Sequence, residues 1–473
     1  MRMAAAVGSL TTRRLWVHLD VNKTLIGVDP ASGQDVHTAL VGSLGKCVFG
    51  RVRDRSEHGC DLSEAIDSIP RLSLPDGSEL PSKERKGFRF LAEGEDSVAL
   101  EPPAVADGAT LHSLVGFLER EVLPYMEEAS ADARGLVRSE VRAANEAIKT
   151  ARRAALDLVL RPGGAAARFL PHLQAMKDAL AVPPALAPAY AASGLSHAAD
   201  GSLRFLCPAY FTLLQWLARN RPESTVVIRT FGTDLPEVVA EHNAFCEGRH
   251  PLYPAGPRLD GSPFAIGGGS EGRGATGGPA AGPGAGAGAG AAPPEGEAGR
   301  PGVDFRLRCP EGTGAMLRFA DGPMGTAMST VRVGAEGKGA GPAQVVVGTA
   351  AIHEELERRR ALGMRAMGIQ DHYRWWKSHD EVGEAGKVLL VKDGPAALSE
   401  ELSVFFDDNI GGHRAKIVDA RDYTTGEPVP FSRSKGLFLR KVAMPLVLKG
   451  DSFFVDGVRD AERRADAIVN GEA

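Results

Sequence analysis

Two short acidic segments near opposite ends of the chain carry the residue types best suited to chemistry. Asp20 follows an apolar run at residues 15–19, and Asp407 and Asp408 follow a second apolar run. Carboxylates that gather in one place repel one another, and a divalent hard cation relieves that repulsion. Magnesium suits them because it binds one or two carboxylates and keeps waters and phosphate oxygens in its shell. We therefore expect Mg²⁺ where the two segments meet.

A phosphate on that cation needs positive charge and hydrogen-bond donors on its other side. Thr230 ends a third apolar run and is followed by Phe231 and Gly232, and two lysines, Lys377 and Lys387, lie between it and the second acidic segment. We expect the threonine, the two residues after it and one lysine to bind the phosphate. Lys387 is preferred because a glycine precedes it and permits a close approach to a ligand. Lys377 is the alternative.

The elements that must position these residues are three strands of one sheet. Residues 15–19, 224–230 and 403–406 are β-rich, and the order helix, strand, turn, helix around the second run is that of a doubly wound sheet. Carboxyl ends of parallel strands meet at one edge, so we expect the three ends to converge. Asp20 is then placed to attack phosphorus in line and form an aspartyl-phosphate. The predicted fold class is α/β, with a Rossmann-like doubly wound parallel sheet.

The ordered set of motifs resembles that of the haloacid dehalogenase-like (HAD) superfamily, whose members are mostly phosphohydrolases. The superfamily's first motif is an apolar strand followed by Asp-x-Asp-x-Thr. Its second is an apolar strand that ends in Ser or Thr, its third is a lysine, and its fourth is an apolar strand that ends in acids. In this chain the four motifs read Asp20-Val21-Asn22-Lys23-Thr24, Thr230, Lys387 or Lys377, and Asp407-Asp408.

The resemblance implies a role for each matching residue. Asp20 is the expected nucleophile, and Thr230 is expected to bind the phosphoryl group. Asp20 and Asp407 would hold Mg²⁺ together with the backbone carbonyl of Asn22, and Asp408 is a further candidate ligand. The implied substrate is a small phosphorylated metabolite or a phosphoprotein.

The chain departs from the family pattern at Asn22. In the phosphatases of the family, an acid at this place protonates the leaving oxygen and later activates water. An amide does not titrate and does neither. Asn22 therefore predicts slow hydrolysis, a leaving group that needs no proton, another proton source such as His18 or His413, or no turnover.

Three functions follow from this pattern. We expect a magnesium-dependent phosphohydrolase or phosphotransferase that acts through Asp20. The alternative is a catalytically weak HAD-like protein that binds a phosphorylated ligand or a protein partner. The third is a purely structural α/β protein.

The remaining sequence predicts one core domain with a large insertion. Residues 14–40 and 200–460 are assigned to the core, and residues 41–199 to a mostly helical insertion in the position of a cap. Apolar residues at helical spacing predict helices over 107–160 and 352–367. The aromatic-rich residues 371–376 are expected to pack in the core or line a pocket. Residues 267–302 are nearly all Gly, Ala and Pro and predict a disordered loop.

Composition excludes some classes of partner. The net charge is −5, so no global positive field recruits nucleic acid. No apolar run approaches the roughly 18–20 residues needed to cross a membrane. Five scattered cysteines without a Cys-x-x-Cys pair favour reduced thiols. We expect a cytoplasmic protein, and the basic, acid-free first 14 residues leave organellar targeting open. The oligomeric state stays open.

Overall fold

The computed structural model describes most of the 473 residues. The described ranges are 13–27, 34–54, 60–82, 86–91, 98–105, 107–126, 137–196, 198–254, 258–262, 302–307, 315–319, 327–332, 345–379, 381–411 and 415–472. The loop expected at 267–302, apart from Gly302, and His413 therefore lie outside the described residues.

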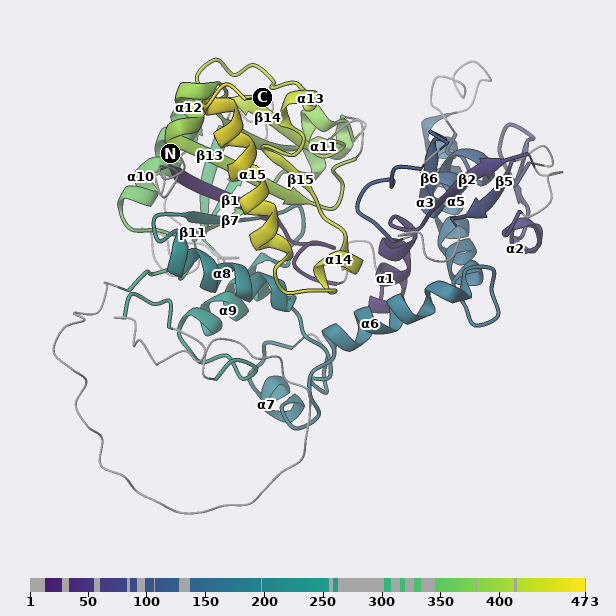
Figure 1. Ribbon diagram of the computed structural model, residues 1–473, viewed down its shortest axis with the longest axis horizontal. Coiled ribbons are helices and arrows are strands. Elements are labelled where there is room, and N and C mark those ends of the chain that lie inside the picture. Colours follow the sequence, from purple (N-terminus) through teal and green to yellow (C-terminus); the bar gives the residue numbers. More distant parts are fainter. Residues whose placement is uncertain are drawn as a thin grey trace, which may run out of the picture.

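An eight-stranded sheet forms the centre of the larger of two lobes, in the order β10-β9-β8-β11-β7-β1-β13-β15 (Figure 1). Neighbours from β8 to β15 run parallel, whereas β9 runs antiparallel to both of its neighbours. The mostly parallel α/β sheet predicted from the sequence is confirmed. The strands are β1 (Arg14–Asp20), β7 (Thr225–Thr230), β8 (Ala315–Phe319), β9 (Ala327–Arg332), β10 (Val345–Val347), β11 (Ala366–Gln370), β13 (Glu401–Asp407) and β15 (Leu439–Lys441).

Both faces of this sheet are covered, because side chains alternate along each strand. On one face Val17 and Leu19 join the core formed with three helices, α8 (Pro208–Asn220), α9 (Leu235–Cys246) and α15 (Phe453–Val469). On the other face Trp16 packs with α10 (Thr349–Ala361) and with β12 (Lys387–Val391), which pairs in parallel with β14 (Val418–Asp422). The two covered faces explain why β1 is mostly apolar and buried along nearly its whole length.

Shorter elements complete the large lobe. They are α7 (Ala187–Ala192), α11 (Tyr373–Ser378), the 3₁₀ turn η4 (Gly383–Ala385), α12 (Pro395–Glu400), α13 (Phe431–Ser434) and α14 (Met444–Val447). Helix α7 falls within the expected insertion, yet Tyr190 on it donates a buried hydrogen bond of 3.0 Å to Glu241 of α9. It therefore packs on the large lobe.

The second lobe combines a small antiparallel sheet with helices (Figure 1). Its elements are β2 (Phe49–Arg53), α2 (Ser63–Asp67), β3 (Leu72–Ser73), β4 (Glu79–Leu80), β5 (Gly87–Phe90), β6 (Leu111–Ser113), α3 (Leu114–Phe117), the π-helical turn η2 (Leu118–Val122) and α5 (Arg138–Val159). Helices α1 (Val36–Gly45) and α6 (Leu170–Leu180), the latter after η3 (Ala167–Phe169), run between the two lobes.

Two expected helices differ from the structure. Within 107–160, residues 111–113 form β6, which pairs antiparallel with β2, and α3 begins only afterwards. Within 352–367, the helix ends at Ala361, Gly363 follows with a φ of 88°, and Ala366 begins β11. In both places a short apolar run fits helix and strand spacing equally well, and pairing with a neighbouring strand decides the outcome.

The chain leaves and re-enters the large lobe at adjacent points. The backbone N–H of Cys207 donates to the carbonyl of Leu25 at 2.8 Å, and that of Val182 donates to Ser202 at 2.8 Å. The second lobe is thus an excursion between β1 and β7. Among the described residues, no helix has both the length and the apolar character needed to span a membrane.

Candidate functional site

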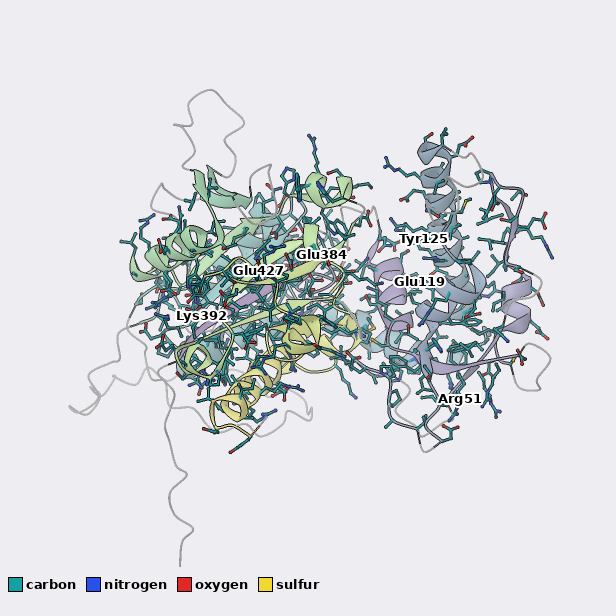
Figure 2. The ribbon with its side chains drawn as sticks, turned by 90° about the horizontal axis from the view of Figure 1, so that it is seen from above. Arg51, Glu119, Tyr125, Glu384, Lys392 and Glu427 are labelled. Atoms are coloured by element: carbon teal, nitrogen blue, oxygen red, sulfur yellow. The ribbon has the colours of Figure 1, made fainter. Side chains whose placement is uncertain are left out.

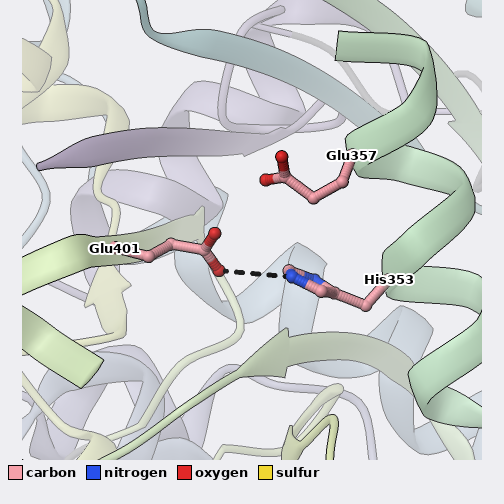
Figure 3. A group of neighbouring side chains, drawn as sticks. All are labelled: His353, Glu357 and Glu401. Carbon is pink, nitrogen blue, oxygen red and sulfur yellow. Dashed lines mark ion pairs between the residues drawn. The ribbon is translucent and has the colours of Figure 1, made fainter. Parts of the chain in front are cut away.

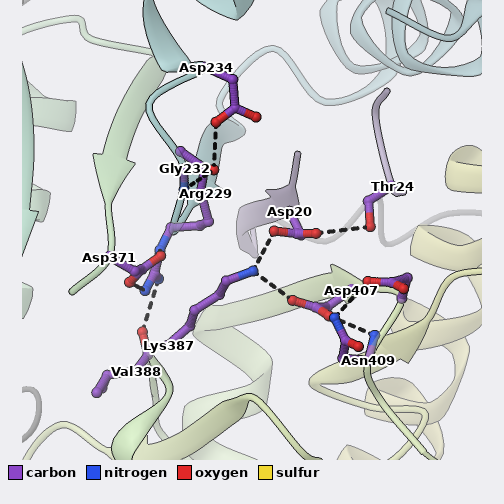
Figure 4. Close-up of polar contacts among 12 residues, drawn as sticks. Asp20, Thr24, Arg229, Gly232, Asp234, Asp371, Lys387, Val388, Asp407 and Asn409 are labelled. Atoms are coloured by element: carbon purple, nitrogen blue, oxygen red, sulfur yellow. Dashed lines mark hydrogen bonds and ion pairs between the residues drawn. The ribbon is translucent and has the colours of Figure 1, made fainter. Parts of the chain in front are cut away.

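The three strand ends singled out in the sequence lie side by side. Strands β7, β1 and β13 are adjacent and parallel, and Asp20 at the end of β1 lies in register beside Arg229, one residue before Thr230. Leu19 lies in register beside Phe406, the residue before Asp407. The carboxyl ends of these strands therefore present their polar residues at one edge of the sheet (Figure 4).

Lys387 joins two of these strand ends. Its ammonium group contacts the Asp20 carboxylate and donates a hydrogen bond of 2.8 Å to Oδ2 of Asp407 (Figure 4). Lys387 is the first residue of β12, and its side chain is 2% exposed. Lys377 lies on α11 with an exposed side chain, 3.3 Å from the Tyr373 hydroxyl. The structure therefore places Lys387 in the acidic group and Lys377 outside it.

Three carboxylates form the acidic group. One oxygen from each of Asp20, Asp407 and Asp408 lies within 4.8 Å of the others, and all three residues are buried. The backbone N–H of Asn409 donates to Oδ1 of Asp407 at 2.8 Å, and the Asn409 amide donates to Oδ1 of Asp408 at 2.7 Å. Lys46, the residue after α1, pairs with Oδ2 of Asp408 at 2.9 Å. Two lysines thus face three acids.

Burial and mutual repulsion shift the titration of this group. Burial raises the pKa of Asp20 well above its ordinary value, Lys387 opposes that rise, and Asp407 adds to it. The pKa of Asp407 is raised in the same way, by burial first and then by Asp408, again against Lys387. Burial alone would lower the pKa of Lys387, but the charges of Asp20 and Asp407 outweigh it and raise the pKa. The Lys387 ammonium group therefore stays charged. Three carboxyl groups face only two lysines, Lys46 and Lys387, so the carboxyl groups outnumber the positive charges by one.

A tight turn after β1 holds Asn22 and Thr24 beside the nucleophile candidate. The Val21 carbonyl accepts hydrogen bonds from the N–H groups of Leu25 at 2.9 Å and Thr24 at 3.3 Å, and Lys23 adopts a φ of 58°. The Thr24 hydroxyl donates to Oδ2 of Asp20 at 3.3 Å. Oδ1 of Asn22 is buried and accepts no hydrogen bond from any described residue. This oxygen is an open acceptor two residues after Asp20.

Thr230 is held by the loop that follows it. Its hydroxyl accepts a hydrogen bond of 2.8 Å from the N–H of Gly232 and donates one of 3.0 Å to Oδ1 of Asp234. Burial raises the pKa of Asp234, and its Oδ2 is buried with no hydrogen-bond donor among the described residues. Asp234, absent from the sequence-based site, therefore controls where the Thr230 proton points.

The sequence also missed a buried ion pair behind the site. Arg229 donates to Oδ2 of Asp371 at 3.0 Å, contacts Oδ1 of the same carboxylate, and donates to the Val388 carbonyl at 2.9 Å. The Asp371 N–H in turn donates to the Thr230 carbonyl at 2.7 Å. This pair ties β7 to β12 and so helps set the position of Lys387. Its only sequence signal is an acid directly after β11, a strand whose first two residues were expected to end a helix.

Aromatic side chains lie next to Lys387. Its ammonium group is 5.2 Å from the centroid of the Phe231 ring. That ring stacks on Trp376 with centroids 5.2 Å apart and planes at 15°, and Tyr373 meets both rings at 6.0 Å. We call Phe231, Tyr373 and Trp376 the aromatic cluster. No residue of α11 is fully buried, but Trp376 is partly buried and packs against the hydrophobic core, as expected for residues 371–376.

Among the described residues, no hydrogen bond or ion pair joins His18 to the acidic group. Its ring stacks on Phe405 at 5.7 Å within the sheet. Burial, and then the charge of Arg229, hold its pKa well below the ordinary value. It is therefore neutral at physiological pH and embedded between strands.

A second group of possible metal ligands lies at the opposite end of β13 (Figure 3). Single ligand atoms of His353, Glu357 and Glu401 fall within 4.8 Å of one another. Arg14 lies 3.4 Å from Glu401, however, and Arg360 lies 2.8 Å from Glu357. Two guanidinium groups already balance the two carboxylates, so this group is an ion-pair cluster.

The two lobes face each other near the site. Figure 2 shows Glu119 and Tyr125 on the side of the second lobe turned toward the large lobe, which presents Glu384 there. The Lys46–Asp408 pair and a hydrogen bond of 2.6 Å from Lys441 to the Leu100 carbonyl join the lobes. The second lobe thus reaches the acidic group directly.

The donor set fits a hard divalent cation. It offers three buried carboxylates, whose oxygens are donors of the kind that Mg²⁺ binds. No family model, curated protein or solved structure matches this chain. The argument for function therefore rests on the geometry of the site.

Proposed function

We propose that this protein is a magnesium-dependent phosphohydrolase or phosphotransferase of the HAD-like kind, with Asp20 as the nucleophile. The observation that supports this most directly is the acidic group of Asp20, Asp407 and Asp408, with Lys387 donating to two of its members. Such an arrangement suits phosphoryl transfer, in which catalysis is mainly positioning and charge neutralisation.

Each residue has a distinct part in the proposed reaction. Asp20 supplies the attacking carboxylate, and the Thr24 hydroxyl orients it by donating to Oδ2. Thr230 ends β7, the strand beside β1, and Lys387 begins β12 and contacts Asp20. Both residues bind the phosphoryl oxygens, together with the loop at Gly232. Asp407 and Asp408 hold Mg²⁺, which when bound neutralises charge on the phosphoryl group. The second lobe serves as a cap over this edge of the sheet and restricts water access.

A second candidate function is favoured by Asn22. Because the amide cannot act as a general acid or base, the chain lacks help that is typically worth about 10²–10⁴-fold in rate. The protein would then bind a phosphorylated ligand with Mg²⁺ and turn it over slowly or not at all.

Acetyl phosphate tests the proposal, because its acetate leaving group needs no proton. We expect phosphate release that depends on Mg²⁺ and a labelled protein species on incubation with ³²P-acetyl phosphate. Asp20→Asn should abolish both, whereas Asp451→Asn, at an exposed aspartate distant in sequence, should change neither. Magnesium-dependent binding of phosphate without turnover or labelling supports the binding protein instead. If calorimetry detects no binding of magnesium, both the enzyme and the magnesium-dependent binding protein are ruled out.

A further inference from the structure

The chemistry available at Asn22 limits which esters the site can cleave. A carboxylate leaves the phosphorus readily, but an alkoxide is about as basic as hydroxide, whose conjugate acid has a pKa of about 15.7. An alkyl phosphate therefore needs a general acid at the leaving oxygen. The pKa of a phenol is only about 10, so a phenolate departs with far less help. Asn22 thus favours substrates with a weakly basic leaving group.

The aromatic cluster adds a second, independent observation. Phe231 directly follows the phosphate-binding Thr230, and its ring lies beside the Lys387 ammonium group at 5.2 Å. The cluster continues outward from there, since Tyr373 is 42% exposed and Trp376 is half-buried. Offset or edge-on contacts between aromatic rings are worth about 0.5–1.5 kcal/mol beyond the area buried. A ring attached to the bound phosphate would find such contacts here.

The second lobe presents a further ring toward this region. Tyr125 is 46% exposed and carries the Arg152 guanidinium group at 3.8 Å from its centroid. The pKa of Tyr125 is raised mainly by burial, and among the carboxylates that add to the shift is Glu381 of the large lobe. Glu381 donates its N–H to the Trp376 carbonyl at 3.1 Å. Tyr125 lies on the side of the second lobe that is turned toward the large lobe (Figure 2), and the charge of Glu381 reaches it there.

We infer that the substrates of this site are aryl phosphate monoesters, held by the aromatic cluster and cleaved without a general acid. The inference rests on the function proposed above. A carboxylate oxygen of Asp20 forms a bond to phosphorus as the bond to the phenolic oxygen breaks, and the electron pair leaves on the phenolate. Water then attacks phosphorus, the Asp20–phosphorus bond breaks, and the carboxylate leaves. Both protons of that water end on the released phosphate as dihydrogen phosphate.

The test compares matched esters that differ in the leaving group. Phosphotyrosine and phosphoserine are each offered as free amino acids and within one peptide sequence, with Mg²⁺. We expect kcat/KM for phosphotyrosine to exceed that for phosphoserine by at least about 100-fold, the lower range of general-acid help. Asn22→Asp should shrink this ratio by restoring phosphoserine hydrolysis. Faster turnover of the free amino acid indicates a small metabolite as the source, and faster turnover of the peptide indicates a phosphoprotein.

Variants of the aromatic cluster separate ring binding from chemistry. Trp376→Ala should raise the KM for phosphotyrosine about 3- to 10-fold relative to the KM for acetyl phosphate, the range that ring contacts supply. Tyr373→Leu, at a more exposed ring, provides a second variant. Trp375→Ala is the matched control, because that ring contacts His379 in place of the cluster.

The outcomes distinguish the inference from the proposed function. If acetyl phosphate is turned over but phosphoserine reacts as well as phosphotyrosine, the aryl assignment fails while the proposed function stands. If acetyl phosphate is inert and no phosphoenzyme forms, the proposed function and the aryl assignment are both refuted.

Discussion

The Lys387 ammonium group contacts the Asp20 carboxylate across 367 positions of sequence. The same group donates to Asp407 at 2.8 Å, so one buried cation joins the carboxyl ends of β1 and β13. The two negative charges stabilise the buried Lys387 ammonium group. They raise its pKa, whereas burial by itself would lower it. Removing it would leave like charges facing each other without compensation.

Lys387→Met should therefore destabilise the protein strongly. Removing one partner of a buried ion pair typically costs about 3–5 kcal/mol. Urea unfolding without added metal measures this loss. The matched control is Lys377→Met, an exposed lysine whose replacement should change stability by no more than about 0.5 kcal/mol. Equal effects of the two substitutions would contradict the assignment of Lys387 to the acidic group.

The buried pair of Arg229 and Asp371 is expected to show strong energetic coupling. Arg229→Met leaves the Asp371 carboxylate unpaired inside the protein, which should cost about 3–5 kcal/mol. Adding Asp371→Leu to that variant should recover part of the loss, because no charge then remains buried. A double-mutant cycle by urea unfolding measures the coupling. Simple addition of the two single effects would show that the residues do not act as a pair.

Lys46→Met should tighten magnesium binding. The Lys46 ammonium group lies 2.9 Å from Oδ2 of Asp408 and competes for that carboxylate. Removing one positive charge near a divalent cation should improve affinity about five-fold at the partly exposed dielectric of this position. Calorimetric titration with Mg²⁺ measures the change, and Lys392→Met at an exposed lysine is the control. Weaker binding would mean that Lys46 orients Asp408 for the metal.

Asp234 should make anion binding depend on pH. While Asp234 is ionised, it takes the Thr230 proton, and the hydroxyl cannot donate it to a bound anion. Burial raises the pKa of Asp234, so as pH falls through that raised pKa the hydroxyl becomes free to donate and affinity should rise. Asp234→Asn should lose this part of the pH dependence, because its amide always donates to Thr230. Sulfate, which does not titrate in this range, is the probe, with Mg²⁺ present and Asp451→Asn as the control.

Glu401 should oppose stability at neutral pH. Burial raises its pKa to about 7, against Arg14 and with help from Glu357. A carboxyl whose pKa is higher folded than unfolded contributes stability below its unfolded pKa of about 4.3 and loses it as pH rises through 7. Glu401→Gln should therefore match the parent near the lower pH and exceed it by up to about 3 kcal/mol at pH 8.

Unfolding in urea at several pH values checks the Glu401 prediction. His353 in the same cluster has its pKa lowered to about 4 by burial, so it gains stability as pH rises and partly masks Glu401 in the parent protein. Comparing the variant with the parent at each pH removes this contribution. Glu400→Gln, at the exposed neighbouring residue, should show no pH-dependent difference. The same flat profile for Glu401→Gln would refute the prediction.

Some features of the fold were predictable because their signals are local. Each of the runs before Asp20, Thr230 and Asp407 is mostly apolar and almost entirely buried, as expected for strands covered on both faces of a parallel sheet. A polar residue directly after such a run lies at the carboxyl edge of the sheet wherever the strand is placed. The α/β class and these three positions therefore followed from the chain alone.

Other features depend on partners that are distant in sequence. The spacing of the two lysines along the chain does not tell which of them contacts the acidic group. Lys387 contacts Asp20 from the start of β12, a strand that is paired with β14. The helix expected over 352–367 ran into the first two residues of β11, because the apolar residues there fit both periods.

By itself, then, the sequence determined which residues end the central strands and that an amide, Asn22, stands two residues after Asp20. Only the tertiary structure decided that Lys387 joins the acids, that Arg229 pairs with Asp371, and that aromatic rings lie beside the lysine. The reason is physical, because local patterns set the period and burial of a segment, whereas ion pairs and ring contacts arise from which segments become neighbours.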